Sequence, residues 1–135
     1  MKTLKSILDT IAEAKQTRTV VKKIQENECF ELKSILQANY NPNISFPFPA
    51  GAPPYEPRED EVEITKDHIQ KLGPMVTNNQ RIRLVEKEMA LISLLESVSA
   101  EDAKIIIAMK DGELEELYPK ITEEVVRKAF PKLLP

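Results

Sequence analysis

The amino-acid sequence predicts an all-α fold: a single-domain bundle of six or seven helices over residues 1–135, with a long Pro-rich loop at residues 41–60. Three observations lead to this prediction. The length of 135 residues fits one domain. Aromatic residues make up only 5% of the chain and Trp is absent, whereas Leu, Glu and Lys are plentiful, which favours helices over sheets. Apolar residues recur at three- and four-residue spacing in most segments, as on one face of a helix.

Three short helices are expected in the first forty residues. Thr3 is a candidate N-cap of the first, and a break at residues 15–17 precedes the second. Asn27 ends the second helix or caps a third, which runs from about Glu28 to Asn39. The apolar side chains that we expect to be buried are Leu4, Ile7, Leu8, Ile11, Val20, Val21, Ile24, Phe30, Leu32, Ile35 and Leu36. Helices of this length need packing against their neighbours to be stable.

The segment from Asn41 to Asp60 has a different composition. Six of its twenty residues are proline, so neither a helix nor a central strand can run through it. Phe46, Phe48 and Tyr55 are unusual residues for a free linker. Two interpretations remain open: an ordered loop laid across the bundle with Phe46 and Phe48 tucked in, which we favour, or an exposed ligand for the groove of a partner protein.

A longer helix is predicted from about Asn78 to Val98. Its apolar arc is wide for a surface helix, and we therefore expect it to be the central helix of the bundle, with neighbours on more than one side. Arg81 and Arg83 fall in its predicted first turn. Their charge has the wrong sign for the helix dipole, which favours anions at the N-terminus.

Shorter helices are predicted on either side of this long one. Thr65 is the candidate cap of a helix that precedes it, and Ser99 is the candidate cap of a helix that follows it and ends at Gly112. Glu113–Glu116 is expected to form an exposed single turn. Thr122 is the candidate cap of the last helix.

No catalytic signature is found, and we expect a non-enzymatic protein without a cofactor or a small-molecule substrate. Three glycines leave no Gly-rich phosphate loop. Cys29 and His68 are far apart, so neither a metal site nor a nucleophile–base pair is predicted. Lys110-Asp111-Gly112 lacks one residue of the Lys-x-Asp-Gly motif of nucleotidyltransferases, and we interpret it as a helix C-cap.

The composition also bounds the compartment and the kind of partner. A single cysteine fits a reducing compartment, and no segment is long and apolar enough for a membrane span, so we expect a soluble intracellular protein. The net charge of −3 argues against a general nucleic-acid coat protein, although it leaves room for a local basic face.

Basic residues cluster near both ends of the chain. Lys15, Arg18 and Lys22 are spaced so that they share a helix face. The second cluster flanks the last predicted helix and consists of Lys120, Arg127, Lys128 and Lys132. Phosphate binding would require several of these cations to converge.

The two ends of the chain resemble those of a known domain. The start, Met1–Ala12, and the end, Lys128–Pro135, are similar to the ends of the N-terminal helical DNA-binding domain of ATP-dependent DNA ligases from T-even-type tailed phages. The length of that domain agrees, and the middle of the chain resembles small uncharacterised proteins of marine tailed phages. The resemblance implies an all-helical module, in the cytoplasm of an infected host cell, that grips duplex DNA through its backbone.

The resemblance also implies particular DNA contacts. Thr122 and Lys128 match a small or hydroxyl residue before the last helix and a lysine within it, and Lys120 stands where the ligase pattern has a small residue. Glu123 and Glu124 place negative charge beside these positions. The adenylation domain of ligases has no counterpart in these 135 residues, so we expect no ligation.

Two functions are therefore hypothesised. The first is weak, sequence-independent binding to the backbone of duplex DNA, through Lys15, Arg18, Lys22, Lys120, Thr122 and Lys128. The alternative is a protein-interaction or virion-associated module of a phage that has lost DNA binding and that contacts another phage protein through Phe46, Phe48 and Tyr55.

Overall fold

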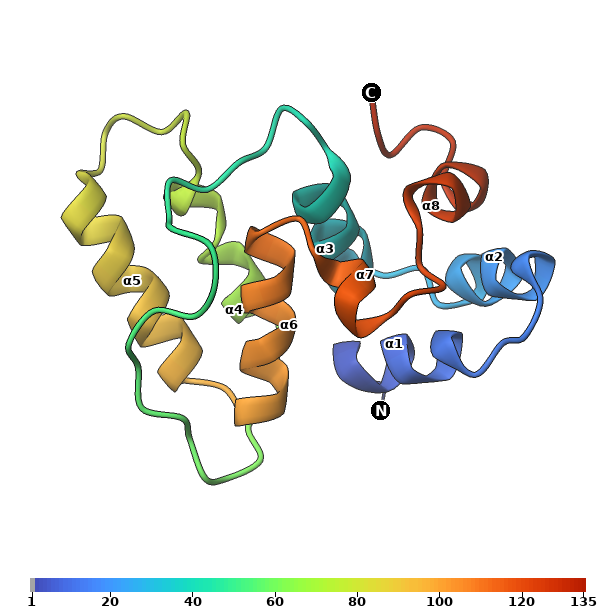
Figure 1. Cartoon of the computed structure of the whole chain (residues 1–135), viewed down its shortest axis with the longest axis horizontal. Helices are drawn as coiled ribbons and strands as arrows, with labels where there is room; N and C mark the ends of the chain where they lie inside the picture. The colour runs from blue at the N-terminus through green and yellow to red at the C-terminus, as the bar shows by residue number, and fades with distance from the viewer. Residues whose placement is uncertain (1) are drawn as a thin grey trace.

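The computed structural model describes residues 2–135, and the prediction of an all-α fold is confirmed for them (Figure 1). The elements in chain order are α1 (Leu4–Ala12), α2 (Thr17–Glu26), α3 (Phe30–Tyr40), α4 (Lys66–Gln70), the 3-10 helix η1 (Gly73–Met75), α5 (Leu84–Glu96), α6 (Ala100–Lys110), α7 (Leu114–Leu117) and α8 (Glu123–Ala129). This described part contains eight α-helices, where six or seven were expected, because the turn after Gly112 forms the separate helix α7.

The helices are arranged along one long axis (Figure 1). α5 lies at one end, α2 and α8 lie at the other, and α3, α6 and α7 lie between them. The hydrophobic core draws residues from all eight α-helices. The largest side chains with almost no exposed surface are Leu4, Leu8, Ile11, Ile24, Leu32, Ile35, Leu36, Leu95, Ile105, Ile106, Met109 and Leu114. α1, α3 and α6 each supply three of these, and α6 lies near the middle of the long axis (Figure 1).

The prediction that the long helix begins near Asn78 and is central was wrong. α5 begins only at Leu84, because the Asn79 side chain bonds to Pro74 O at 2.8 Å and to the Arg81 amide at 3.1 Å, and so holds a turn in place of a helix. Arg83 is its N-cap residue.

α5 is also a surface helix, with one side buried in the core and the other exposed to solvent. Leu91, Leu94 and Leu95 are buried, and the helix packs against α6 and η1. Leu84 and Met89 face outward, with 50% and 67% of their surface exposed. The wide apolar arc therefore reflects an uncovered face of α5, whereas we had expected it to be covered by neighbours on several sides.

Several predictions about helix ends are confirmed. The hydroxyls of Thr3, Ser99 and Thr122 each accept the backbone amide three residues on, at 3.2 Å. Gly112 ends α6 with φ of +69°. Phe30, the first residue of α3, is not buried as expected, because 43% of the residue is exposed. The Lys66 ammonium lies 5.2 Å from the centre of its ring.

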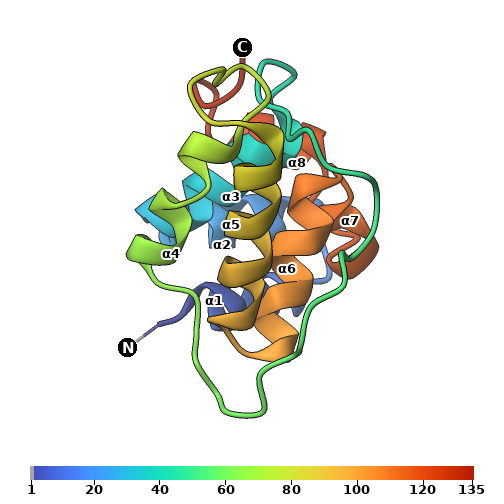
Figure 2. The same ribbon diagram turned by 90° about the vertical axis from the view of Figure 1, so that its left-hand side faces the viewer.

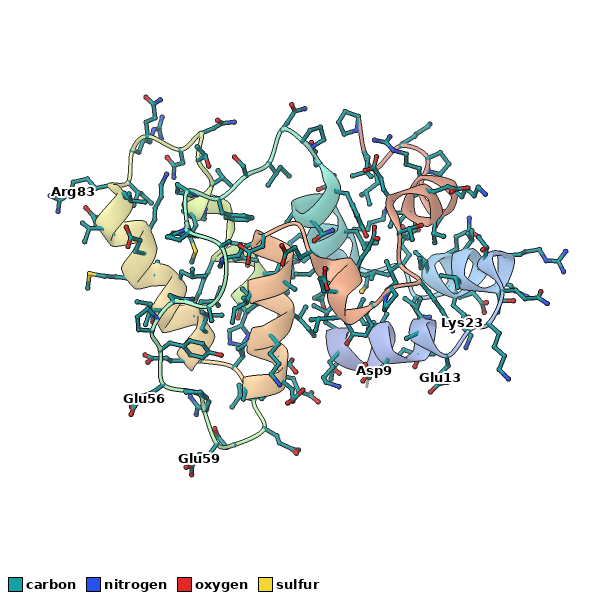
Figure 3. The ribbon with its side chains drawn as sticks, in the orientation of Figure 1. Asp9, Glu13, Lys23, Glu56, Glu59 and Arg83 are labelled. Atoms are coloured by element: carbon teal, nitrogen blue, oxygen red, sulfur yellow. The ribbon has the colours of Figure 1, made fainter. Side chains whose placement is uncertain are left out.

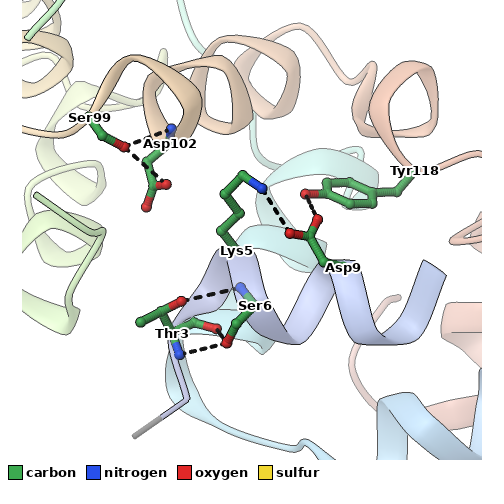
Figure 4. Close-up of polar contacts among 7 residues, drawn as sticks. All are labelled: Thr3, Lys5, Ser6, Asp9, Ser99, Asp102 and Tyr118. Atoms are coloured by element: carbon green, nitrogen blue, oxygen red, sulfur yellow. Dashed lines mark hydrogen bonds and ion pairs between the residues drawn. The ribbon is translucent and has the colours of Figure 1, made fainter. Parts of the chain in front are cut away.

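Asp102 lies at the start of α6, where it contacts Ser99 (Figure 4), and it joins this helix to the segment before α4. Its carboxylate accepts the Ile64 amide at 2.9 Å and the Ser99 hydroxyl at 3.2 Å, and only 2% of the residue is exposed. The Ser99 amide in turn donates to Val62 O at 2.7 Å. A buried carboxylate with these two donors fixes the path of the chain from the Pro-rich segment into α4.

Lys110 and Asp111 hold the Pro-rich segment against the end of α6. The Lys110 ammonium donates to Pro49 O at 3.0 Å and to Asp111 at 2.6 Å, and the second carboxylate oxygen of Asp111 accepts the Gly51 amide at 2.8 Å. Both side chains are almost fully buried, at 1% and 9% exposed. The sequence predicts only a C-cap at these residues, because the contacts with the Pro-rich segment span about sixty positions.

The aromatic side chains of the Pro-rich segment are half-buried. Phe46, Phe48 and Tyr55 pack against the core, and the rings of Phe46 and Phe48 are stacked with centroids 6.4 Å apart. The sequence left open whether these rings are tucked in or exposed, and they are tucked against the bundle.

Replacing Asp102 by Ala should destabilise the fold. The Ile64 amide would lose its acceptor in a buried place, which costs about 1–3 kcal/mol of unfolding free energy. The matched control is Glu101→Ala, because the neighbouring Glu101 is exposed and its ion pair with Lys104 contributes less than about 1 kcal/mol. Urea denaturation of the two variants measures the difference, and equal destabilisation would contradict the assignment.

Alkaline pH should weaken the fold partly through Tyr118. Its hydroxyl donates to Asp9 at 3.0 Å, and burial, followed by this hydrogen bond, raises the pKa of Tyr118 above its usual value of 10.0 (Figure 4). The folded state therefore holds the proton more tightly than the unfolded state, and this stabilisation is complete below pH 10.0 and lost above it.

Tyr118→Phe should therefore lose stability less steeply than the wild type above this pH. Urea denaturation at neutral and alkaline pH measures the two slopes. Parallel pH profiles for the two proteins would show that Tyr118 does not carry the effect.

Candidate nucleic-acid interface

The C-terminal segment is tied to the first three helices. α8 packs against α2 in the most extensive helix–helix contact of the structure. The Gln25 side chain donates to Ala129 O at 3.1 Å, and the Gln37 side chain donates to Leu133 O at 3.2 Å. These contacts bring the two basic clusters of the sequence to the same end of the molecule (Figure 1).

A groove runs between α2 and α8, and we name it the α2–α8 groove. It is lined by Thr17, Arg18, Val21, Lys22, Gln25 and Lys128. The spacing of Arg18 and Lys22 places both on one face of α2, and α8 adds Lys128 from the other end of the chain. Three of the six residues predicted to contact DNA therefore line one surface feature.

The α2 side of this groove carries uncompensated positive charge. Among the described residues, neither Arg18 nor Lys22 forms an ion pair or a side-chain hydrogen bond, and the same holds for Lys15 just before α2. All three residues are exposed. Residues 15–25 contain four basic residues and no acidic one. The fourth is Lys23, labelled in Figure 3. Its ammonium donates to Thr10 O at 3.2 Å.

The α8 side is electrically neutral. Lys128 pairs with Glu124 at 3.0 Å, and Arg127 pairs with Glu123 at 2.9 Å. Both pairs join residues four apart on the exposed face of α8. Each acid also lies in the first turn of the helix, where negative charge suits the helix dipole.

Lys120 and Thr122 do not line the groove. The Lys120 ammonium donates to Ala12 O at 3.2 Å and to Ala14 O at 2.5 Å, so it satisfies free carbonyls at the end of α1. The Thr122 hydroxyl caps α8 by accepting the Val125 amide. Both residues therefore have structural partners. The cap formed by Thr122 follows from the sequence, but the contacts of Lys120 do not, because they span more than one hundred positions.

The half-buried aromatic residues of the alternative hypothesis lie away from this groove. Phe48 lines a separate cleft between the Pro-rich segment and α5. Lys110, the only basic residue there, already bonds to Pro49 and Asp111.

Of the described helices, none has the length and apolar character that crossing a bilayer requires. Within residues 2–135, no three His, Cys, Asp or Glu side chains come together as a metal ion would need.

Comparison with known proteins identifies one family. No curated protein matches the chain, and neither does any solved structure. The profile of a family described as "Family of unknown function (DUF6433)" matches residues 7–116, which is most of the chain. The matched region includes Lys15 and α2 with Arg18 and Lys22, and it ends within α7, before α8. The chain belongs to the DUF6433 family.

Proposed function

We propose that this protein is a non-enzymatic helical module that contacts the backbone of duplex DNA through the α2–α8 groove, weakly and without reading sequence. One observation carries the proposal: Arg18 and Lys22 line a single groove together with Lys128 from the opposite end of the chain. The resemblance of both chain ends to the DNA-binding domain of phage ligases supports the same function.

The arrangement suits phosphate groups better than base edges. Lysine and arginine side chains that no internal carboxylate engages are free to neutralise phosphates, and each contact releases condensed counterions. Lys15 lies before α2 and so does not share the helix face expected from its spacing, and it does not line the groove. It is a third exposed cation close in sequence to Arg18 and Lys22. Contacts to phosphates position a protein on DNA but carry no sequence information.

The acids of α8 limit the affinity. Glu123 and Glu124 neutralise Arg127 and Lys128 and lie close to where a phosphate would approach. In this proposal α2 supplies the principal contacts and Lys128 adds to them. Lys120 and Thr122 act indirectly, by fixing the ends of α1 and α8.

The alternative function, a protein-interaction module of a phage, has less structural support at the residues first considered for it. Phe46, Phe48 and Tyr55 pack against the core and help to hold the Pro-rich segment in place. Side chains with this role offer a partner less surface than free aromatic residues would.

Reversing one charge on α2 should weaken DNA binding. With Lys15, Arg18 and Lys22 as contacts, the logarithm of the binding constant should fall with the logarithm of salt concentration with a slope of about −3. Lys22→Glu should make that slope shallower, with a magnitude of about 2 or smaller. It should also lower the affinity for every duplex sequence alike. Fluorescence anisotropy with a labelled duplex at several salt concentrations measures both quantities.

The matched control is Lys71→Glu, which makes the same change in net charge at an exposed site at the C-terminal end of α4, a helix that lies away from α2 and α8 (Figure 1). It should leave binding close to that of the wild type. Equal losses for Lys22→Glu and Lys71→Glu would indicate a general charge effect and contradict the proposed surface. Absence of binding at low salt would contradict the function itself.

Removing one acid from α8 should have the opposite effect. Glu124→Gln keeps the shape of the side chain but frees Lys128 from its ion pair and removes a charge that repels phosphate. We expect tighter binding at low salt and a steeper salt dependence, measured in the same anisotropy assay. Unchanged or weaker binding would show that α8 does not approach DNA.

A further inference from the structure

A cleft between α5 and the segment that follows α4 is lined by lysine, serine and apolar side chains and by no carboxylate. We name it the α4–α5 cleft. Figure 2, viewed from the α5 end, shows α5 in front with α4 beside it, and η1 packs against α5. The volume of the cleft is about 350 Å³, which is within the range of small-molecule sites. Two lysines without an acid, in a chain of net charge −3, make this cleft a candidate site for an anion.

Lys87 is the buried cation of the α4–α5 cleft. Only 5% of the residue is exposed. Its ammonium carries three N–H donors, and one of them bonds to Val76 O at 2.8 Å. Among the described residues, no carboxylate pairs with Lys87, and no other acceptor takes its two remaining donors. Buried lysines are nearly always paired with an opposite charge, and an anion in the cleft would supply that charge.

Three further polar side chains line the same cleft. Lys71 lies at the C-terminal end of α4, is exposed, and forms no ion pair or side-chain hydrogen bond within residues 2–135. The Ser97 hydroxyl donates to Leu94 O at 2.6 Å. The Ser93 hydroxyl has no hydrogen-bond partner in the described part of the chain, so it can donate to a ligand.

The rest of the cleft is apolar. Met75 and Leu94 are each 2% exposed and contribute to its wall, and Ile82 lines it as well. A bare inorganic ion would leave this apolar surface uncovered, whereas a ligand with an apolar part would cover it.

We propose that the α4–α5 cleft binds a small phosphate monoester that carries an apolar substituent. A phosphate monoester has a charge of about −1.5 to −2 at neutral pH and three acceptor oxygens, which matches two ammonium groups and a free hydroxyl. Lysine binds phosphate as a point charge and needs no bidentate geometry. A carboxylate brings one charge and would leave half of the positive charge without a partner.

This site is separate from the proposed DNA contact. The α4–α5 cleft shares no residue with the α2–α8 groove, and α4 and α5 lie away from α2 and α8 (Figure 1). A change at Lys71 should therefore affect the small ligand and leave duplex binding unaltered. Either proposal can fail without the other.

An NMR titration of the full chain with phenyl phosphate tests the site. Amide shift changes should cluster at residues 71–76 and 87–97, with a dissociation constant of about 1 mM or tighter for a ligand of this size. Inorganic phosphate lacks the apolar part and phenol lacks the charge, so each should bind at least about tenfold more weakly.

Two variants test the lysines. Lys71→Gln should weaken phenyl phosphate about tenfold, and Lys87→Met should weaken it about a hundredfold, because a buried charge interacts more strongly than an exposed one. The matched control is Lys104→Gln, which removes one charge from an exposed lysine of α6 that does not line the cleft. It should bind like the wild type. Lys71→Gln changes an exposed site and keeps the test decisive if Lys87→Met fails to fold.

Three results would overturn the proposal. Shift changes that are absent, or confined to residues 17–25 and 128, would place no phosphate in the α4–α5 cleft. Equal affinity for phenol and phenyl phosphate would show that the cleft accepts an apolar group without recognising the charge. Equal losses for Lys71→Gln and Lys104→Gln would indicate a general charge effect.

Discussion

The packing of α8 against α2 is the contact on which the rest of the molecule depends. α8 has seven residues and α2 has ten, and helices of this length are marginal in water without tertiary contacts. Val20 and Ile24 on one side and Val125 and Val126 on the other enter the same core. Each helix is therefore stable because the other is present, and the groove that holds Arg18, Lys22 and Lys128 exists only while they are together.

The two ends of the molecule have different chemistry, and a few buried polar groups keep them in place. Asp102 fixes the start of α6, while Lys110 and Asp111 hold the Pro-rich segment over its end. α6 thus connects an end that presents free cations with an end that presents an apolar helix face.

Much of the fold could be predicted from the sequence because it rests on local chemistry. The caps at Thr3, Ser99 and Thr122 follow from side chains that bond three residues away, and Gly112 ends its helix through a backbone angle that favours glycine. The central position assigned to α5 was wrong because a helical pattern shows which residues are apolar, but cannot show whether a neighbour covers them.

The candidate site was predictable only in part, for the same reason. The common face of Arg18 and Lys22 follows from helical spacing, but their meeting with Lys128 depends on the path of more than one hundred residues. The contacts of Lys120 with the end of α1 and of Lys110 with Pro49 also join residues far apart in the sequence, by 106 and 61 positions. Nothing local distinguishes a lysine that caps a remote helix from one that is free to bind phosphate.

The central claim, that the end formed by α2 and α8 is the one that meets DNA, is tested most directly by NMR. Amide chemical shifts of the full chain would be followed while a short duplex is added at low salt. The account predicts that shift changes cluster at residues 15–25 and 122–128 and leave α5 unaffected. Changes confined to α5 or to the Pro-rich segment, or no changes at all, would contradict it.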